Sequence, residues 1–196
     1  MKIQIVTLSY NVQGKGTGGA SGPEALLRAG LVGELQRQGH EVPEPVSVQL
    51  TPDEEIQYGG WNRVALAGGH LCRLVSGARA DGAFILGLLA DCNGCLGVLG
   101  GLQNSRRDGV SGPSPRVGLV YVDAHGDYNT PDTSPSGMLG GMPAAVAAGK
   151  CLPRLRTRSG ILTPVLCEDM VMAGMRDLDE PEEEAFLEDA VFAVPQ

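Results

Sequence analysis

The chain has 196 residues, of which 42% are hydrophobic and 19% charged, and its formal net charge is -8 at pH 7. This composition is ordinary for a globular protein, and we expect residues 1–196 to form one domain. The negative charge argues against a nucleic-acid partner, because phosphate binding depends on clustered Lys and Arg.

The N-terminus and the cysteines indicate a compartment. The stretch from Met1 to Ser9 is too short and too polar for a signal peptide or a membrane span, so we expect a cytoplasmic protein with no membrane partner. Five cysteines form no even disulfide framework, which suits a reducing compartment. Cys92 and Cys95 have the spacing of a redox or zinc pair, but no second pair stands at zinc-ribbon spacing.

Strands and helices alternate in the first half of the predicted chain. The glycine-rich stretch from Gly14 to Gly22 is expected to be a loop, and it lacks the Gly-Lys-Ser/Thr ending of a phosphate-binding loop. His40 at a helix end and His70 on a packing helix are not expected to bind ligands. The predicted elements are a strand over residues 2–8, a helix from Pro23 to about Gln38, a strand over 46–50, a helix over 62–80 and a strand over 82–90.

A polar run follows the next predicted strand. Val117 to Val122 is apolar and β-branched, as in a buried parallel strand, and is preceded by a polar loop over residues 103–116. In extended backbone Asp123, His125 and Asp127 would point to the same side. Two carboxylates and an imidazole suit a divalent metal, and a carboxylate can bridge two ions. The alternative to a metal site is that Asp123 caps the next element, His125 is an ordinary loop histidine and Asp127 starts a turn.

A second polar tip ends the strand over residues 82–90. Asp91, Cys92 and Asn93 follow that strand as Asp123 follows Val122. The carboxyl ends of parallel strands collect at one edge of a sheet, where ligand sites form. We therefore expect the two tips to converge.

Three stretches together resemble the ureohydrolase family of arginases, agmatinases and formiminoglutamases. They are Val122-Asp-Ala-His-Gly-Asp127, Asn129-Thr-Pro131 and Ser136-Gly-Met-Leu-Gly-Gly-Met-Pro143. The resemblance implies an α/β fold, a single three-layer α-β-α domain with a mainly parallel sheet of about six strands. It also implies hydrolysis of a linear amidine C–N bond in a small guanidino or amidino substrate, such as arginine, to urea and an amine.

The resemblance also implies a metal site. Its ligands would be Asp123, His125 and Asp127, and Asp127 would also be the catalytic residue. The cofactor would be two divalent ions, expected to be manganese. Cys92 takes the place of a family histidine that binds the first ion, and as a thiolate it would be a fourth metal ligand. A thiolate prefers zinc over manganese, so the resemblance does not decide which metal this site prefers.

Four further residues would bind the substrate. By the family register Asn129 and Ser136 would meet an α-carboxylate, and Asp179 an α-amino group, with Glu182 behind it. Asn129 and Ser136 have an alternative interpretation as ordinary loop residues. A second possibility, that Asp177 and Asp179 form the metal-binding Asp-x-Asp pair, fails because the family's pair comes later. Gly140 stands where the family has a histidine near the substrate.

Family members continue beyond the point matching Gln196, and that part carries two more metal-binding aspartates. We therefore expect an incomplete domain with weaker metal binding, because ligand number and charge set affinity. Two functional hypotheses follow: a ureohydrolase-like hydrolase, or a non-catalytic homologue that serves as a binding or oligomer-partner subunit. Uncovered strand edges predict a homo-oligomer.

Overall fold

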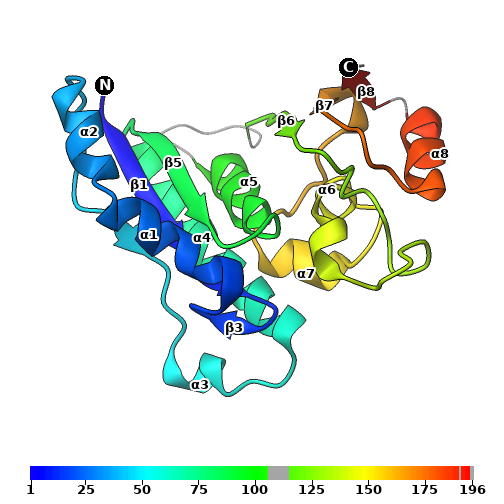
Figure 1. The fold of residues 1–196 in the computed structure, drawn as a ribbon, viewed down its shortest axis with the longest axis horizontal. Coiled ribbons are helices and arrows are strands. Elements are labelled where there is room, and N and C mark those ends of the chain that lie inside the picture. Colours follow the sequence, from blue (N-terminus) through cyan, green and yellow to red (C-terminus); the bar gives the residue numbers. More distant parts are fainter. Residues whose placement is uncertain (106–114, 190, 195–196) are drawn as a thin grey trace.

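The computed structural model describes residues 1–105, 115–189 and 191–194 (Figure 1). The predicted loop over 103–116 therefore lies largely outside the described residues. The strands are β1 (Ile3–Leu8), β2 (Tyr10–Asn11), β3 (Gly14–Lys15), β4 (Val46–Ser47), β5 (Phe84–Leu89), β6 (Leu119–Val122), β7 (Met170–Ala173) and β8 (Phe192–Val194). The helices are α1 (Gly22–Arg28), α2 (Leu31–Arg37), α3 (Pro52–Glu55), α4 (Gly60–Ala80), α5 (Gly94–Asn104), α6 (Pro143–Ala147), α7 (Pro153–Arg158) and α8 (Glu180–Glu188). Short 3-10 turns are η1 (Gly18–Ser21), η2 (Leu139–Gly141) and η3 (Cys167–Asp169).

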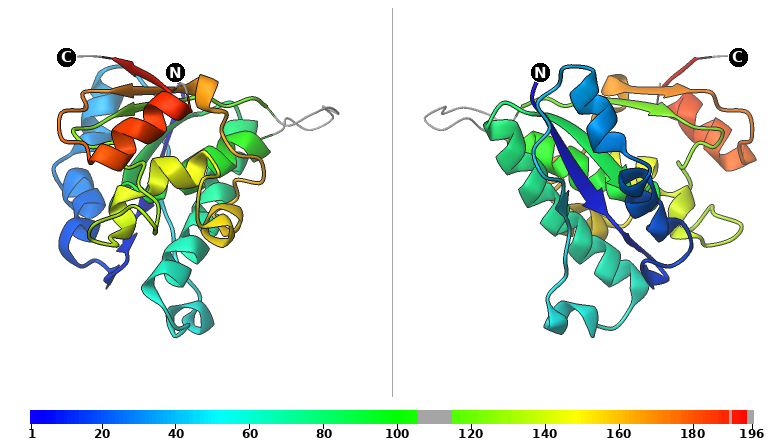
Figure 2. Two further views of the ribbon diagram at one scale, coloured as in Figure 1. Left: turned by 90° about the vertical axis from the view of Figure 1, so that its right-hand side faces the viewer. Right: turned by 60° about the vertical axis from the view of Figure 1, so that its left-hand side comes forward.

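The N-terminal half is built around a parallel sheet of order β4-β1-β5, in which Ile3 pairs with Phe84. Ile3 and Ile5 on one face pack against apolar side chains of α1 and α2. Val6 and Leu8 on the opposite face pack against α4. Helices thus cover both faces of this sheet, which gives three layers (Figure 2).

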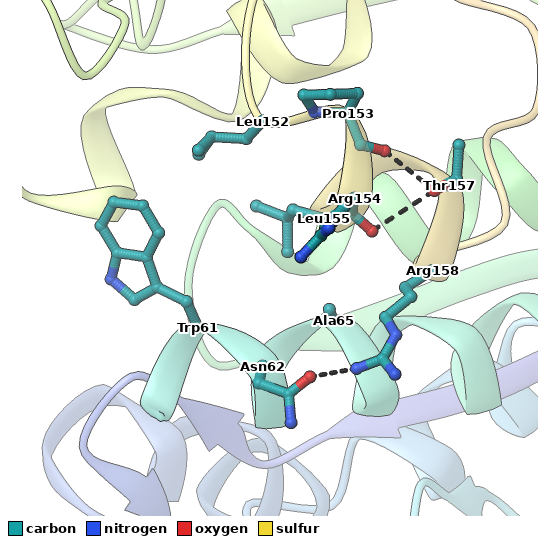
Figure 3. Close-up of a pocket in the computed structure, with 9 residues that line it drawn as sticks. All are labelled: Trp61, Asn62, Ala65, Leu152, Pro153, Arg154, Leu155, Thr157 and Arg158. Atoms are coloured by element: carbon teal, nitrogen blue, oxygen red, sulfur yellow. Dashed lines mark hydrogen bonds between the residues drawn. The ribbon is translucent and has the colours of Figure 1, made fainter. Parts of the chain in front are cut away.

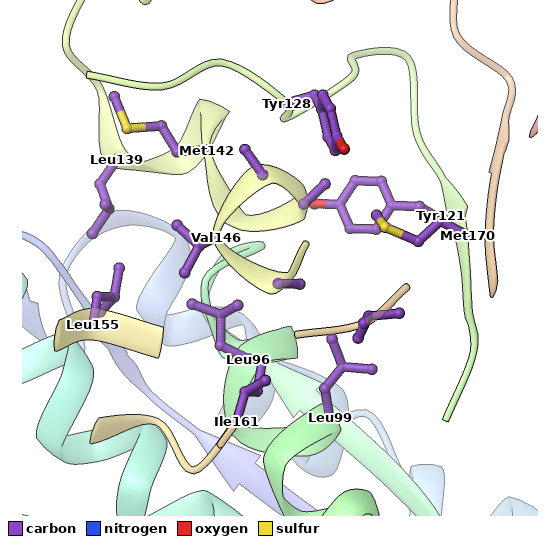
Figure 4. Packing of buried hydrophobic residues seen from close by; sticks show 14 of the residues in the cluster. Leu96, Leu99, Tyr121, Tyr128, Leu139, Met142, Val146, Leu155, Ile161 and Met170 are labelled. Atoms are coloured by element: carbon purple, nitrogen blue, oxygen red, sulfur yellow. The ribbon is translucent and has the colours of Figure 1, made fainter. Parts of the chain in front are cut away.

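The C-terminal half has a second parallel sheet, of order β6-β7-β8. Its inner face carries Tyr121, Met170 and Met172 into the largest buried cluster, together with α5 and α6 (Figure 4). On the outer face Val120 and Val122 are 68% and 77% exposed. The predicted strand over residues 117–122 is therefore confirmed in place, but the expectation that it is buried on both faces is wrong.

Helix α5 joins the two halves by packing closely on α4. A Cβ at Gly97 would lie 2.6 Å from the Gly68 carbonyl oxygen, and one at Gly101 would lie 2.5 Å from Val75 Cβ. Neither distance leaves room for a side chain, so these glycines let the helix backbones approach. The far side of α5 presents Leu96 and Leu99 to the C-terminal core.

The α/β class with parallel strands and flanking helices is confirmed, and three details are corrected. The described strands form two three-stranded parallel sheets and an antiparallel β2-β3 pair, instead of one sheet of about six strands. The helix expected from Pro23 to Gln38 is two helices, because Gly30 between them has a φ of 94° that ends the first. The strand expected over residues 46–50 is only two residues long.

None of the described helices combines the length and the apolar character that crossing a membrane requires.

Candidate metal centre

The carboxyl ends of β5 and β6 converge, as the sequence predicted. Cys92, in the turn after β5, places its Sγ 4.0 Å from Oδ2 of Asp123, directly after β6. One ligand atom from each of Cys92, Asp123 and Asp127 lies within 4.8 Å of the other two. A thiol and two carboxylates from distant parts of the chain thus form one group, here called the cysteine–aspartate cluster.

Asp127 is the most enclosed member of the cluster. The Asp127 residue is 6% exposed, and the Tyr121 hydroxyl donates a 2.5 Å hydrogen bond to its Oδ2. Its own carbonyl oxygen accepts from the amides of Ala144 and Ala145, at the start of α6. Burial raises the pKa of the Asp127 carboxyl above its usual value. An incoming cation would offset that cost of ionisation.

Cys92 is half-buried beside these carboxylates. Burial, followed by the negative charge of Asp127, raises the pKa of its thiol to about 11. Burial also raises the pKa of Cys95, one helical turn further on. Both thiols are therefore protonated at neutral pH in the metal-free protein, unlike the low-pKa thiols of redox Cys-x-x-Cys sites.

His125 lies outside the cluster, on the other side of Asp123. Its ring is 60% exposed, with Nδ1 3.4 Å from Asp123 Oδ1 and Nε2 3.6 Å from Asp177 Oδ2. The backbone leaves the extended conformation here, because Asp123 Oδ1 accepts from the His125 amide and Asp127 has a φ of 48°. The expectation that Asp123, His125 and Asp127 share one side is therefore wrong for His125. Asp123 instead presents one oxygen to each side.

Three of the four predicted substrate residues lie together, beside the segment that carries Asp127. They are Asn129, Asp179 and Glu182. The Asn129 amide donates to Asp179 Oδ2 at 2.7 Å. Both oxygens of buried Glu182 accept backbone amides, from Tyr128 at 2.8 Å and from Asp179 at 3.1 Å. Glu182 therefore lies behind Asp179, and it ties the start of α8 to the loop after β6.

Ser136 lies apart from these three in an exposed turn. Its hydroxyl accepts from the Met138 amide at 3.2 Å, and no described hydrogen bond joins it to Asn129 or Asp179. The substrate role of Ser136 stays a prediction.

Two contributors to the site were not predicted. Tyr121 holds Asp127, and the alternation of side chains along β6 could have suggested it, because Tyr121 and Asp123 are two residues apart. Asp177 approaches His125 from the loop after β7, a contact between segments far apart in sequence that no local pattern signals.

A separate cavity of about 760 Å³ opens between α4 and α7 (Figure 3). Trp61 and Arg158 line it, and the Arg158 guanidinium donates to Asn62 across the junction of the two helices. None of the predicted site residues lines this cavity. We therefore place the candidate centre at the strand ends.

Parallel strands with flanking helices and ligating side chains at the strand ends define an α/β protein with a candidate metal centre. Comparison with known proteins gives the family: the arginase family matches residues 1–194, and the chain belongs to it.

Individual relatives agree with this assignment. An arginase of Brevibacillus brevis is 32% identical over 169 residues, 83% of this chain and 53% of the relative. An arginase of Bacillus caldovelox is 31% identical over 176 residues, 87% of this chain and 56% of the relative. The solved arginase of Bacillus subtilis superposes with a TM-score of 0.83 at 27% identity, covering 99% of this chain and 63% of that one. The chain thus spans about half the length of the curated relatives it matches.

Proposed function

We propose that this chain carries part of a ureohydrolase-type active centre, which uses divalent metal to hydrolyse a C–N bond of a guanidino compound such as arginine. The observation that carries the proposal is the cysteine–aspartate cluster, with His125 on the second oxygen of Asp123. Relatives that are named arginases support the reaction class. The comparisons give no support to the alternative, a non-catalytic homologue.

The donor set fits divalent cations. Cys92, Asp123 and Asp127 would hold an ion on the buried side, and Asp123 Oδ1 with His125 would hold one on the exposed side. A bound divalent ion would act as a Lewis acid that lowers the pKa of a water molecule. Tyr121 would orient Asp127 as a ligand, because its hydroxyl fixes one carboxylate oxygen. Manganese as the natural ion and a cytoplasmic location stay predictions.

The neighbouring polar group suits the amino-acid end of such a substrate. The Asn129 amide is a neutral donor suited to an α-carboxylate, and Asp179 is an acceptor suited to an α-ammonium. These two side chains form a hydrogen bond with each other in the structure, and a bound substrate would replace it with one hydrogen bond to each side chain. Ser136 would add a donor if its turn reaches the ligand.

Urea release tests the proposal directly. The purified 196-residue chain, loaded with manganese or with zinc, is incubated with arginine, agmatine and formiminoglutamate, and urea or formamide is measured. We expect slow, metal-dependent release that Asp123→Asn abolishes, because both sides of the centre lose their shared ligand. Asp132→Asn, in the exposed loop after Thr130, is the matched control and should leave the rate unchanged. No release with either ion at high protein concentration would refute the proposal.

A further inference from the structure

The two sides of this centre differ in ligand chemistry, and the difference points to an ion. We propose that the buried side selects a thiophilic divalent ion of the zinc class over manganese, with the Cys92 thiolate as a direct ligand. The inference rests on the proposed function, since it concerns the same centre. It goes beyond that function by assigning the metal class and the residue that sets it.

The first argument is geometric. The ligand atoms of Cys92, Asp123 and Asp127 lie within 4.8 Å of one another. A tetrahedral ion with bonds of about 2.0 to 2.3 Å needs ligand atoms roughly 3.3 to 3.8 Å apart. A contraction of about 1 Å, within reach of side-chain rotation, would close three protein ligands around one ion and leave a fourth position open.

The second argument concerns how the ligands are held. The turn that carries Cys92 is fixed, because Asp91 accepts the Asn93 amide on Oδ1 at 3.0 Å and the Gly94 amide on its carbonyl oxygen at 3.2 Å. Asp127 is fixed on the opposite side by the Tyr121 hydroxyl. Ligands that are already restrained lose little conformational freedom when an ion binds. The cysteine–aspartate cluster is therefore preorganised for an ion.

The third argument is the choice of donor. Manganese prefers carboxylate, carbonyl and water oxygens, whereas thiolate favours zinc, and the general affinity order of divalent ions also places zinc above manganese. On the exposed side the donors are Asp123 Oδ1 and His125, with no sulfur. The two sides should therefore differ in preference, and the buried side should fill first with the softer ion.

Cobalt(II) is the probe, because it replaces zinc and gives a sulfur-to-metal charge-transfer absorption only when a thiolate is a ligand. The metal-free chain is titrated with cobalt(II) and then with zinc as competitor, while the near-ultraviolet spectrum is recorded. We expect the charge-transfer band to saturate at one equivalent and to disappear as zinc displaces cobalt. Manganese at a large excess should leave the band in place.

Three variants test the role of Cys92. Cys92→Ser should remove the band and weaken zinc binding about 100-fold or more, whereas Cys151→Ser, at a half-buried cysteine outside the cluster, should retain both. Cys92→His should lose the band and narrow the preference for zinc over manganese. Circular dichroism of each variant checks that it is folded.

The outcomes separate this inference from the proposed function. A band that persists in folded Cys92→Ser, or manganese that displaces cobalt at equal concentration, would overturn the inference even if urea is released. A Cys92-dependent band with no urea release would support the inference and refute the hydrolase proposal. Absence of any band in the unmodified chain would overturn the inference alone.

Discussion

The two parallel sheets of this protein have the same number of strands and differ in what covers them. In the β4-β1-β5 sheet, five of the six residues of β1 are buried, because α1 and α2 lie on one face and α4 on the other. In the β6-β7-β8 sheet the central strand β7 is buried only at every second residue, where Met170 and Met172 face the C-terminal core. The same kind of apolar strand is thus interior in one half and half-solvated in the other.

This difference bears on the site, which lies between the two halves. Cys92 follows β5 of the first sheet, and Asp123 and Asp127 follow β6 of the second. Helix α5 packs against both, so the distance across the cysteine–aspartate cluster depends on that joint.

The largest contrast should come from truncating one apolar side chain in each half. Leu71→Ala removes a fully buried side chain of α4 and should lower the free energy of unfolding by about 2–5 kcal/mol, because a cavity remains. Val122→Ala, on the exposed face of β6, should cost less than about 1 kcal/mol. Urea unfolding followed by circular dichroism measures both. Equal losses at protein concentrations where the chain is monomeric would show that the outer face of β6 is packed within the chain itself.

The joint between the halves is the next target. Gly101→Ala places a Cβ 2.5 Å from Val75 Cβ and should destabilise by about 1–3 kcal/mol, because α4 and α5 must move apart. Gly77→Ala, in α4, meets nothing within 4 Å and should stabilise by about 0.5–1 kcal/mol through helix propensity. The same unfolding assay compares them. A neutral Gly101→Ala would argue against a tight joint.

The pH dependence of Asp127 tests the buried side of the centre without metal. Burial raises the pKa of Asp127, so in chelator its ionisation opposes folding as the pH rises through its unfolded and then its folded value. Asp127→Asn should therefore be more stable than the parent chain near neutral pH, while its oxygen still accepts from Tyr121. The difference should vanish below the ordinary carboxyl pKa of about 3.9. A parent chain that is the more stable of the two at neutral pH would contradict this.

The smallest effect on folding, and a clear one on association, is expected at the outer face of β6. We propose that copies of the chain associate through this face, and replacing Val120 and Val122 by Lys should shift sedimentation toward monomer. The free energy of unfolding should change by less than about 0.5 kcal/mol per exposed site. Lysine at the exposed Leu162 is the matched control. An unchanged distribution of sedimenting species would reject this surface.

Much of the fold was predictable because apolar runs and strand-end polar residues are local signals. β1, α4, β5 and β6 lie where periodicity placed them. Cys92 and Asp123 converge as expected, although β5 and β6 belong to two different sheets and the expectation assumed a single one. The cover on each strand was not predictable. An apolar run such as Val117 to Val122 is the same in sequence whether one face or two are packed.

The site geometry departed from prediction where the backbone departs from regular structure. Alternation along an extended strand would align His125 with Asp127, but the turn at Asp123 and the left-handed conformation of Asp127 separate them. Asp123 and Asp127 are not glycines, so neither residue type indicated a change of backbone conformation. Likewise, the break of the helix at Gly30 depends on a positive φ at that residue. The residues around Gly30 favour helix, so the sequence did not indicate the break.

Glu182 joins two parts of the site that chemistry would treat as separate. One of its carboxylate oxygens accepts a hydrogen bond from the Tyr128 amide, directly after Asp127, and the other accepts one from the Asp179 amide. Gly126 packs closely on the same carboxylate, since a Cβ at Gly126 would lie 3.0 Å from Glu182 Oε1. The proposed metal centre and the proposed amino-acid site therefore share Glu182 as a common support. Thermodynamic reciprocity requires that, if a bound cation changes the affinity for the amino acid, the amino acid changes the affinity for the cation by the same factor, which paired titrations of zinc and arginine would measure.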